Sequence, residues 1–411
     1  MTGVARQWHT RAGPGPLAAA AALVDGGAAH AVLIVGPPAV GKSTLATDLA
    51  AGLLCLAPNP ADRPCRGCRA CRLVEAGNHP DLHRLGPEGP GGQVVIGDPD
   101  RPASRGVRTL VAELAYLPVE GGHRVAIVEH AERMNEDAQN ALLKTLEEPP
   151  DRATIILCAD EEDRLLSTVR SRCVRLRMAP LGIRAIEGLL VERGVANASS
   201  AARLARIAAG RPGVAMAYAR LPEAVTIHDE IARSLLDLLA ASPSARLVSG
   251  RDLVERAAAL DAALRPAAPA RPVTARQPRG SARAARLVPA QSILPAPADG
   301  AGATDAGEGG PEPGEPGKRS PSERRRAVLV LLGIWREVAL DLAIAGLGGR
   351  HEVRDPAFLD DLVAAAALVS PAAVGAFLGR LDRVGELVGG NAGPELAVDV
   401  LVLGWPRTAA A

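Results

Sequence analysis

The segment GPPAVGKST at residues 36–44 constrains the fold more than any other part of the chain. It follows a short apolar run, residues 31–35, and precedes a helical pattern. A strand, a glycine-rich loop and a helix in this order are typical of a phosphate-binding loop (P-loop). Gly36 and Gly41 let backbone N–H groups face a phosphate, and the helix N-terminus favours negative charge there.

The side chains that end this segment predict the ligand. Lys42 is suited to the β- and γ-phosphates, Ser43 to Mg²⁺, and Thr44 continues the first helical turn. The motif therefore predicts binding of ATP with Mg²⁺. The alternative is a glycine-rich loop without a ligand.

Four apolar runs predict buried strands, and helical patterns separate them. The runs are residues 31–35, 94–96, 124–128 and 153–158. Strands that alternate with helices indicate a mostly parallel sheet with helices on both faces. Residues 1–179 are thus expected to form an α/β nucleotide-binding domain.

The rest of the chain is expected to be helical. Residues 180–222 predict a small helical lid domain, and residues 223–405 a larger all-α domain. A segment of about 264–322, rich in Pro, Ala, Gly and Arg, lacks the large apolar side chains that would offset ordering entropy, so we expect a disordered insertion. Its arginines could contact nucleic acid, but a solvated linker is the preferred interpretation.

Composition excludes several function classes. The chain has 47 basic and 46 acidic residues, a net charge of +1, which argues against binding nucleic acid by bulk charge. Three Trp, two Tyr and two Phe in 411 residues are too few for a stacking platform for single strands. No apolar run is long enough for a transmembrane helix, and we expect a cytoplasmic protein without a membrane partner.

Hydrolysis of ATP requires an acidic pair after a later strand, one carboxylate for Mg²⁺ and one for the attacking water. The strand at 124–128 is followed by Glu129 and His130. Glu129 takes the metal position, but His130 stands where the second carboxylate is needed. We therefore expect nucleotide binding without efficient turnover.

Cysteines are crowded just after the P-loop helix. Cys55, Cys65, Cys68 and Cys71 have the spacing C-x9-C-x2-C-x2-C within residues 55–71. Four thiolates at such spacings can surround a Zn²⁺ ion, and four protein ligands leave no open position, so the site would be structural. The alternatives are unconnected buried cysteines or a redox pair. Cys158 and Cys173 lie outside the cluster and are expected to be ordinary core thiols.

The order of these motifs resembles a known family. Residues 134–150, MNEDAQNALLKTLEEPP, closely resemble a helix of bacterial clamp-loader subunits, and Ser171-Arg172-Cys173 follows. Over residues 5–220 the chain is similar to the delta-prime and gamma/tau subunits of DNA polymerase III, and residues 391–397 more weakly resemble the end of their C-terminal domain. The resemblance implies an AAA+ domain, a helical lid and an all-α collar.

Departures from the motor (gamma/tau) pattern favour the delta-prime type. The resemblance implies a polar Thr or Asn sensor after the fourth strand, where this chain has Ala159-Asp160, and a lid arginine at position 213, which is glycine. Pro212 is expected to disturb the start of a helix there. Arg172 is intact, and the resemblance implies that it is an arginine finger donated in trans to a neighbouring ATPase subunit.

The resemblance also implies partners. These are the gamma/tau and delta subunits in a hetero-pentameric ring, the sliding clamp transiently, and primer-template DNA, at the replisome on the nucleoid. DNA contact would be to backbone phosphate, with Arg105 or Arg108 as candidates, although solvated helix residues are the preferred interpretation. Alternatives are the ATP-hydrolysing motor subunit, a P-loop kinase, and a scaffold whose P-loop is a relic.

Overall fold

The computed structural model describes residues 6–26, 29–87, 92–98, 100, 105–120, 122–264, 321–389 and 392–408. The predicted disordered insertion, 264–322, lies almost wholly outside these residues. Helix α11 ends at Leu264 and α12 begins at Pro321, at the two edges of the described chain.

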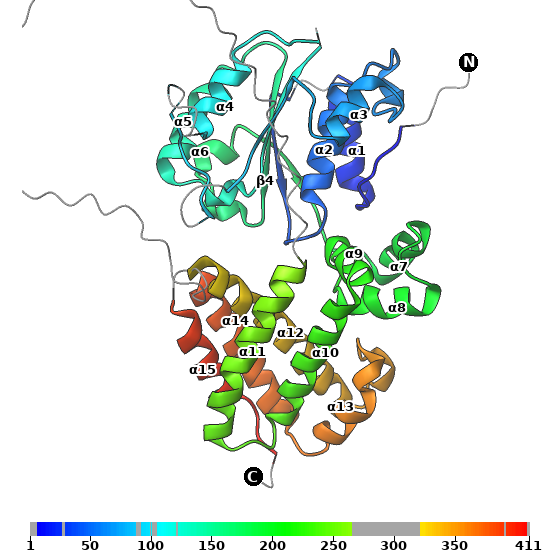
Figure 1. Ribbon diagram of the computed structural model, residues 1–411, viewed down its shortest axis with the longest axis vertical. Coiled ribbons are helices and arrows are strands. Elements are labelled where there is room, and N and C mark those ends of the chain that lie inside the picture. Colours follow the sequence, from blue (N-terminus) through cyan, green and yellow to red (C-terminus); the bar gives the residue numbers. More distant parts are fainter. Residues whose placement is uncertain are drawn as a thin grey trace, which may run out of the picture. The chain divides into compact units, whose positions relative to one another are not determined.

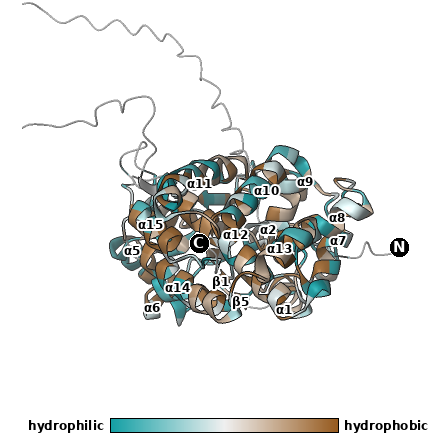
Figure 2. Cartoon of the chain, turned by 90° about the horizontal axis from the view of Figure 1, so that it is seen from below, coloured by the Kyte–Doolittle hydropathy of each residue, from teal (hydrophilic) through white to brown (hydrophobic). Residues whose placement is uncertain are grey.

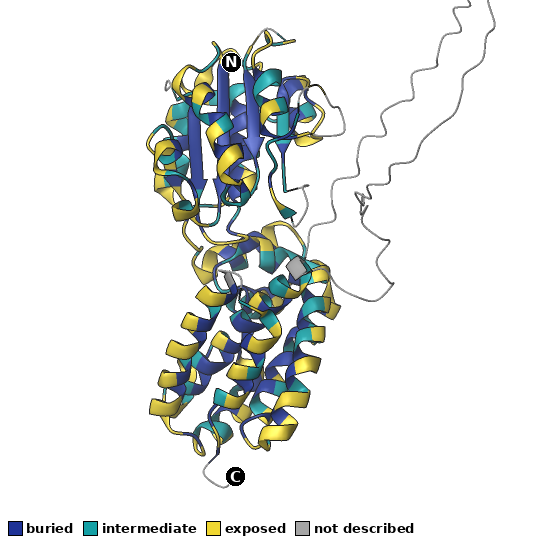
Figure 3. Cartoon of the chain, turned by 90° about the vertical axis from the view of Figure 1, so that its left-hand side faces the viewer, coloured by how far each residue is buried: buried dark blue, intermediate teal, exposed yellow. Residues whose placement is uncertain are grey.

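A five-stranded parallel sheet organises the N-terminal part, in the order β2-β3-β4-β1-β5. The strands are β1 (Ala31–Val35), β2 (Leu82–Leu85), β3 (Arg124–Val128), β4 (Ala153–Ala159) and β5 (Val174–Arg177). In β1, Ala31 and Leu33 pack into one apolar core and Val32 and Ile34 into the other, as a strand covered on both faces requires. The three central strands β3, β4 and β1 are almost wholly buried, whereas the edge strands β2 and β5 are partly exposed (Figure 3).

Helices cover both faces of this sheet (Figure 1). One layer contains α1 (Pro14–Val24), α2 (Lys42–Leu53) and α3 (Arg69–Glu75), and the other α4 (Val107–Leu114), α5 (Glu136–Glu147) and α6 (Ser167–Arg170). Short 3-10 helices are η1 (Pro60–Asp62), η3 (Ala131–Arg133) and η4 (Glu162–Arg164). The predicted α/β P-loop domain with helices on both faces is confirmed.

One strand prediction was wrong. Val94 makes only an isolated bridge to Met134, and the sheet instead contains β2 (Leu82–Leu85), with β5 as a further strand outside the four predicted runs. Leu82 and Leu85 are buried, whereas His83 and Arg84 between them are half-buried and polar. Strand β2 is an edge strand that pairs only with β3, so it lacks the continuous apolar run of the central strands.

Beyond β5, the secondary-structure elements of the described chain are all helices. They are α7 (Ile183–Glu192), α8 (Ala198–Ile207), α9 (Pro212–Arg220), α10 (Pro222–Asp237), α11 (Pro243–Leu264), α12 (Pro321–Gly346), η5 (Arg350–Glu352), η6 (Pro356–Phe358), α13 (Leu359–Ala366), α14 (Pro371–Gly389) and α15 (Pro394–Gly404). Hydrophobic and hydrophilic residues alternate along many of these helices (Figure 2). Trp335, Phe377 and Trp405 meet in their core with ring centroids 4.6–5.7 Å apart.

Within the described chain no single helix is both long and apolar enough to cross a bilayer. Among the described helices, the bent pair Pro356–Ala366 and Pro371–Val388 is long and apolar enough only when the two helices are taken together.

Candidate functional site

The P-loop connects the central strand β1 to helix α2 and depends on two glycines. Gly41 has φ +102°, a conformation that side chains disfavour. A Cβ on Gly36 would lie 2.3 Å from the carbonyl oxygen of Met178, which allows no side chain. Lys42 then begins α2, and Ser43 and Thr44 are exposed in its first turn. The loop therefore has the backbone that phosphate binding requires.

Lys42 is turned toward its own loop. Its Nζ lies 2.7 Å from the carbonyl oxygen of Gly36, 2.8 Å from that of Pro37 and 2.5 Å from Oδ1 of Asp160. Asp160 follows β4, the strand next to β1, so the carboxyl ends of the two strands bring it beside the loop. Sequence reasoning placed Asp160 at a sensor position but missed this contact, because strand order was needed to see it.

The predicted metal position lies beside the serine of the loop. Ser43 Oγ donates a hydrogen bond to Glu129 Oε2 at 2.5 Å, and the Glu129 Oε1 atom is 3.3 Å from the guanidinium of Arg84. Glu129 follows β3, two strands from β1 in the sheet. Ser43 and Glu129 are thus close enough to share a Mg²⁺ ion.

His130 stands at the position of the second carboxylate, in a left-handed conformation with φ +52°. Its Nδ1 is 3.2 Å from Glu132 Oε1 and 3.9 Å from Asp160 Oδ2. The hydrogen bond to Glu132 is the main cause of a raised pKa for His130, against the effect of burial. An imidazole at this position does not supply the fixed negative charge that a carboxylate would place beside the attacking water.

The helical lid reaches the P-loop through glycine rather than arginine. The N–H of Gly213 donates to the carbonyl oxygen of Ala39 at 3.1 Å, and a Cβ at this position would lie 3.0 Å from that oxygen. Arg211 instead bonds the carbonyl oxygen of Ala208 and lies 3.3 Å from Glu337 of α12. Position 213 thus contacts the loop without offering a cation.

The expectation that Pro212 disturbs a helix start was wrong. Pro212 is the first residue of α9. At that position a proline lacks only an N–H that the helix would not use, and its fixed φ suits the helix.

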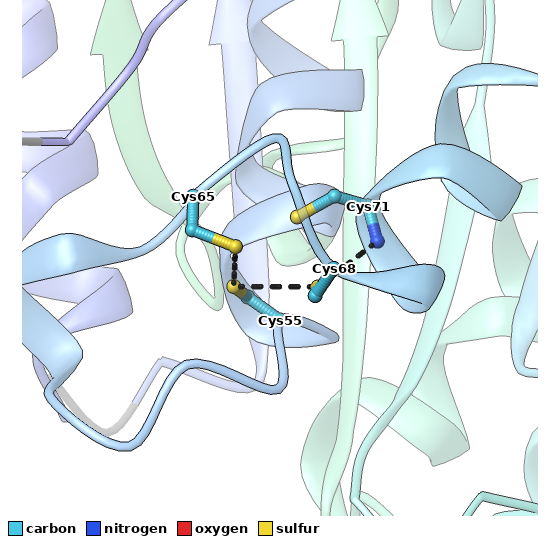
Figure 4. Close-up of side chains that lie close together, drawn as sticks. All are labelled: Cys55, Cys65, Cys68 and Cys71. Atoms are coloured by element: carbon cyan, nitrogen blue, oxygen red, sulfur yellow. Dashed lines mark hydrogen bonds between the residues drawn. The ribbon is translucent and has the colours of Figure 1, made fainter. Parts of the chain in front are cut away.

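The four clustered cysteines bring their sulfurs together (Figure 4). All four Sγ atoms lie within 4.8 Å of one another, with Cys55 3.5 Å from Cys65 and 3.9 Å from Cys68. Tetrahedral zinc thiolate bonds place sulfurs about 3.8 Å apart, so this set fits a zinc ion. The thiols are not joined as disulfides. Burial opposes ionisation of Cys68, but hydrogen bonds led by the backbone N–H of Cys71 lower its pKa to about 7.

The other two cysteines are less reactive. Burial raises the pKa of Cys158 well above its usual range and that of Cys173 to about 11. Cys158 is fully buried within β4, as an ordinary core thiol is.

Arg172 lies after α6 and is partly exposed. Its Nη2 is 2.7 Å from Oε1 of Glu147, and its Nη1 donates to the carbonyl oxygen of Thr168 at 2.9 Å. Both partners are surface groups of the α5 and α6 layer. The guanidinium is therefore accessible to a neighbouring molecule at the cost of an exposed ion pair.

The two candidate DNA contacts differ. Arg105 is paired with Glu113 through two bonds of 2.6 and 2.9 Å, which reduces its availability to a phosphate. Arg108 is exposed on the first turn of α4.

Sequence comparison relates this chain to subunits of DNA polymerase III. A family model described as DNA polymerase III, delta subunit, matches residues 19–182. The delta' subunit of Pseudomonas aeruginosa is 42% identical over 147 residues, covering 36% of this chain and 42% of that protein. The delta' subunit of Escherichia coli is 39% identical over 189 residues, covering 46% and 54%.

Tau subunits are less similar to this chain than the delta' subunits are. The tau subunit of Escherichia coli is 32% identical over 186 residues, covering 44% of this chain and 27% of that protein. Residues 19–182 are thus similar to DNA polymerase III subunits, and the delta' relatives are more similar to this chain than tau is. The chain spans about half the length of the delta' relatives it matches.

Proposed function

We propose that this chain is the delta-prime subunit of a clamp loader. In this role it assembles with gamma/tau and delta subunits in a ring, donates Arg172 to the nucleotide of the adjacent subunit, and helps to load a sliding clamp onto primed DNA. It hydrolyses ATP weakly or not at all. The names of its relatives support the assembly, and the geometry of its own residues supports the division of labour.

The contacts of the lid residues support weak hydrolysis of ATP. Gly213 is the lid residue that contacts the P-loop, and it has no side chain. Arg211, the nearby cation, is engaged with Glu337. His130 stands in place of the second carboxylate and Gly213 in place of the lid arginine, so two groups expected of an efficient ATPase are replaced. The interpretation is a P-loop that binds more readily than it cleaves.

The side chain of Arg172 is chemically suited to act as an arginine finger. A guanidinium stays charged at any physiological pH and can pair with a phosphate in two directions. An arginine supplied in trans contributes about 10³–10⁵ in rate to phosphoryl transfer. Its present partner, Glu147, has a half-exposed side chain, so the exchange of carboxylate for phosphate has a small cost.

The proposal includes two ligands, a structural zinc ion and ATP with Mg²⁺. Cys55, Cys65, Cys68 and Cys71 would hold a structural zinc ion that stabilises a segment with little core of its own. Gly36, Gly41, Lys42, Ser43 and Thr44, with Glu129 at the metal, would hold ATP with Mg²⁺.

The second candidate is the ATP-hydrolysing motor subunit, which the complete GPPAVGKST motif favours. Steady-state ATPase of the purified full chain separates the two. A motor turns over ATP by itself, whereas the proposed subunit does so barely.

The finger is tested in a reconstituted clamp loader. Arg172→Ala is expected to lower the DNA- and clamp-stimulated ATPase at least tenfold. Arg170→Ala is the matched control, because Arg170 also lies at the end of α6 and pairs only with the exposed Asp163 among the contacts described there. Unchanged ATPase with Arg172→Ala, in a complex that assembles normally, would overturn the proposal.

A further inference from the structure

The ammonium group of Lys42 has all its donors engaged within the chain. A lysine carries three N–H donors. Two reach the carbonyl oxygens of Gly36 and Pro37, and the third reaches the carboxylate of Asp160 at 2.5 Å. The Lys42 side chain is only 8% exposed. No donor is left for a phosphate unless one of these partners moves.

Asp160 is held in place for this contact. It directly follows β4, which lies between β3 and β1. Its backbone N–H donates to Glu132 Oε2 at 3.1 Å, which orients the residue at the carboxyl edge of the sheet. The other carboxylate oxygen, Oδ2, is 3.9 Å from His130 Nδ1. The side chain is 21% exposed and so sits inside the site rather than on the outer surface.

We propose that Asp160 is an internal competitor for the phosphate groups of the nucleotide. Its carboxylate takes the position on Lys42 that a β- or γ-phosphate oxygen would otherwise take. A nucleotide that enters must displace Asp160 from Lys42, and its negative charge is repelled by that carboxylate as long as it stays nearby. This inference rests on the proposed nucleotide binding and deepens it, because it names the residue that limits affinity.

The alternative role for Asp160 is as a cation ligand. His130, Glu132 and Asp160 offer ligand atoms within 4.8 Å of one another. The ammonium of Lys42 lies 2.5 Å from Asp160, however, and its positive charge opposes a metal ion at the same carboxylate. The two roles predict opposite effects of removing the charge of Asp160. If Asp160 is a competitor, removing the charge tightens nucleotide binding, and if it is a Mg²⁺ ligand, removing the charge weakens binding.

The experiment measures the affinity of a fluorescent ATP analogue for the purified full chain, with and without added Mg²⁺. Asp160→Asn keeps the side-chain shape and removes the charge, and it is expected to tighten binding about tenfold. Glu161→Gln is the matched control, since Glu161 is the adjacent acid and contacts the exposed Arg164. It is expected to bind like the wild type. Asp160→Ser repeats the test without an amide, and thermal unfolding checks that each variant is folded.

The possible outcomes distinguish failure of the Asp160 competitor role from failure of the proposed nucleotide binding. Equal or weaker binding by both folded Asp160 variants would overturn the competitor role, and a loss confined to Mg²⁺-containing samples would assign Asp160 to the metal. Lys42→Ala is expected to abolish binding and, combined with Asp160→Asn, to remove the gain. Binding that survives Lys42→Ala would instead refute the P-loop as the nucleotide site, and the inference with it.

Discussion

Arg66 of the cysteine segment forms an ion pair with Asp48 of the P-loop helix, and both side chains are buried. Asp48 also accepts bonds from the backbone N–H and the hydroxyl of Thr10, at 2.8 and 2.7 Å. Arg66 lies between the second and third cysteines and has φ +56°. One carboxylate thus links the cysteine cluster, the N-terminal segment and the helix that follows the phosphate loop.

Replacing Arg66 is expected to destabilise the fold while leaving the cysteines intact. Arg66→Met strands the buried Asp48 carboxylate and should cost about 3 kcal/mol in the free energy of unfolding. Asp48→Asn should cost less, because Arg66 keeps Glu75 at 3.2 Å and the amide oxygen still accepts from Thr10. Urea unfolding measures both, and native mass spectrometry checks bound metal. Equal losses in the two variants would contradict this account.

Metal content is the direct test of the cysteine cluster. The chain purified without chelator is expected to contain one zinc ion, and Cys68→Ser to lose it with a lower unfolding temperature, because a structural zinc contributes folding free energy. Cys173→Ser is the matched control outside the cluster and should retain zinc. Detection of a disulfide among residues 55–71 in freshly purified protein would favour the redox alternative.

Arg246 is a buried cation with carbonyl partners. It is 0% exposed and bonds the carbonyl oxygens of Leu239 and Ala241 after α10, and of Val402, Trp405 and Pro406 at the end of α15. Both helices direct the negative ends of their dipoles toward it. The guanidinium therefore joins the C-terminal segment to the helical core.

Truncating this side chain should unfold the helical part more easily. Arg246→Met leaves several buried carbonyl groups unsatisfied, and we expect a loss of at least about 3 kcal/mol in urea unfolding. Arg246→Lys should recover part of the lost stability, because an ammonium still donates to some of these carbonyl groups. The recovery should be incomplete, because an ammonium has fewer donors than a guanidinium and all of them lie on one atom. Arg251→Met, an exposed position on the same helix, is the control. A wild-type stability in Arg246→Met would rule out this role.

His228 predicts a pH dependence of stability. Burial lowers its pKa, but contacts with Asp229 at 3.3 Å and Glu337 at 3.6 Å outweigh this and raise the pKa from 6.5 to about 9. Because the folded value is the higher one, protonated His228 stabilises the fold. That contribution is complete below pH 6.5, declines as the pH rises and is lost above about 9.

The measurement is the unfolding midpoint of wild type and His228→Gln across this range. The difference between them should shrink as the pH approaches about 9. The subtraction removes the contribution of Cys68, whose pKa of about 7 falls in the same window. A difference that grows with pH would show that His228 is neutral in the folded protein.

Local patterns were enough for the phosphate loop, three of the five strands and the cysteine cluster. Each depends on neighbours in the chain: the strand at 31–35 is apolar throughout because both its faces are covered, and the loop glycines follow it directly. The same logic failed at the edge of the sheet. The half-buried Leu82–Leu85 has no continuous apolar run, and in the apolar run 94–96 only Val94 is a buried core residue, which forms an isolated bridge and no ladder.

Contacts between segments that are distant in the sequence could be identified only from the tertiary structure. The pairing of β1 with β4 brings Asp160 to Lys42 across 118 positions, and the packing of the lid brings Gly213 to Ala39 and Arg211 to Glu337. The spacing of residues in the sequence does not predict the order of strands in the sheet, nor which face of a helix packs against which neighbouring element. Residue types therefore predicted a loop suited to a phosphate, while the arrangement of strands and helices decided which side chains contact Lys42 of that loop.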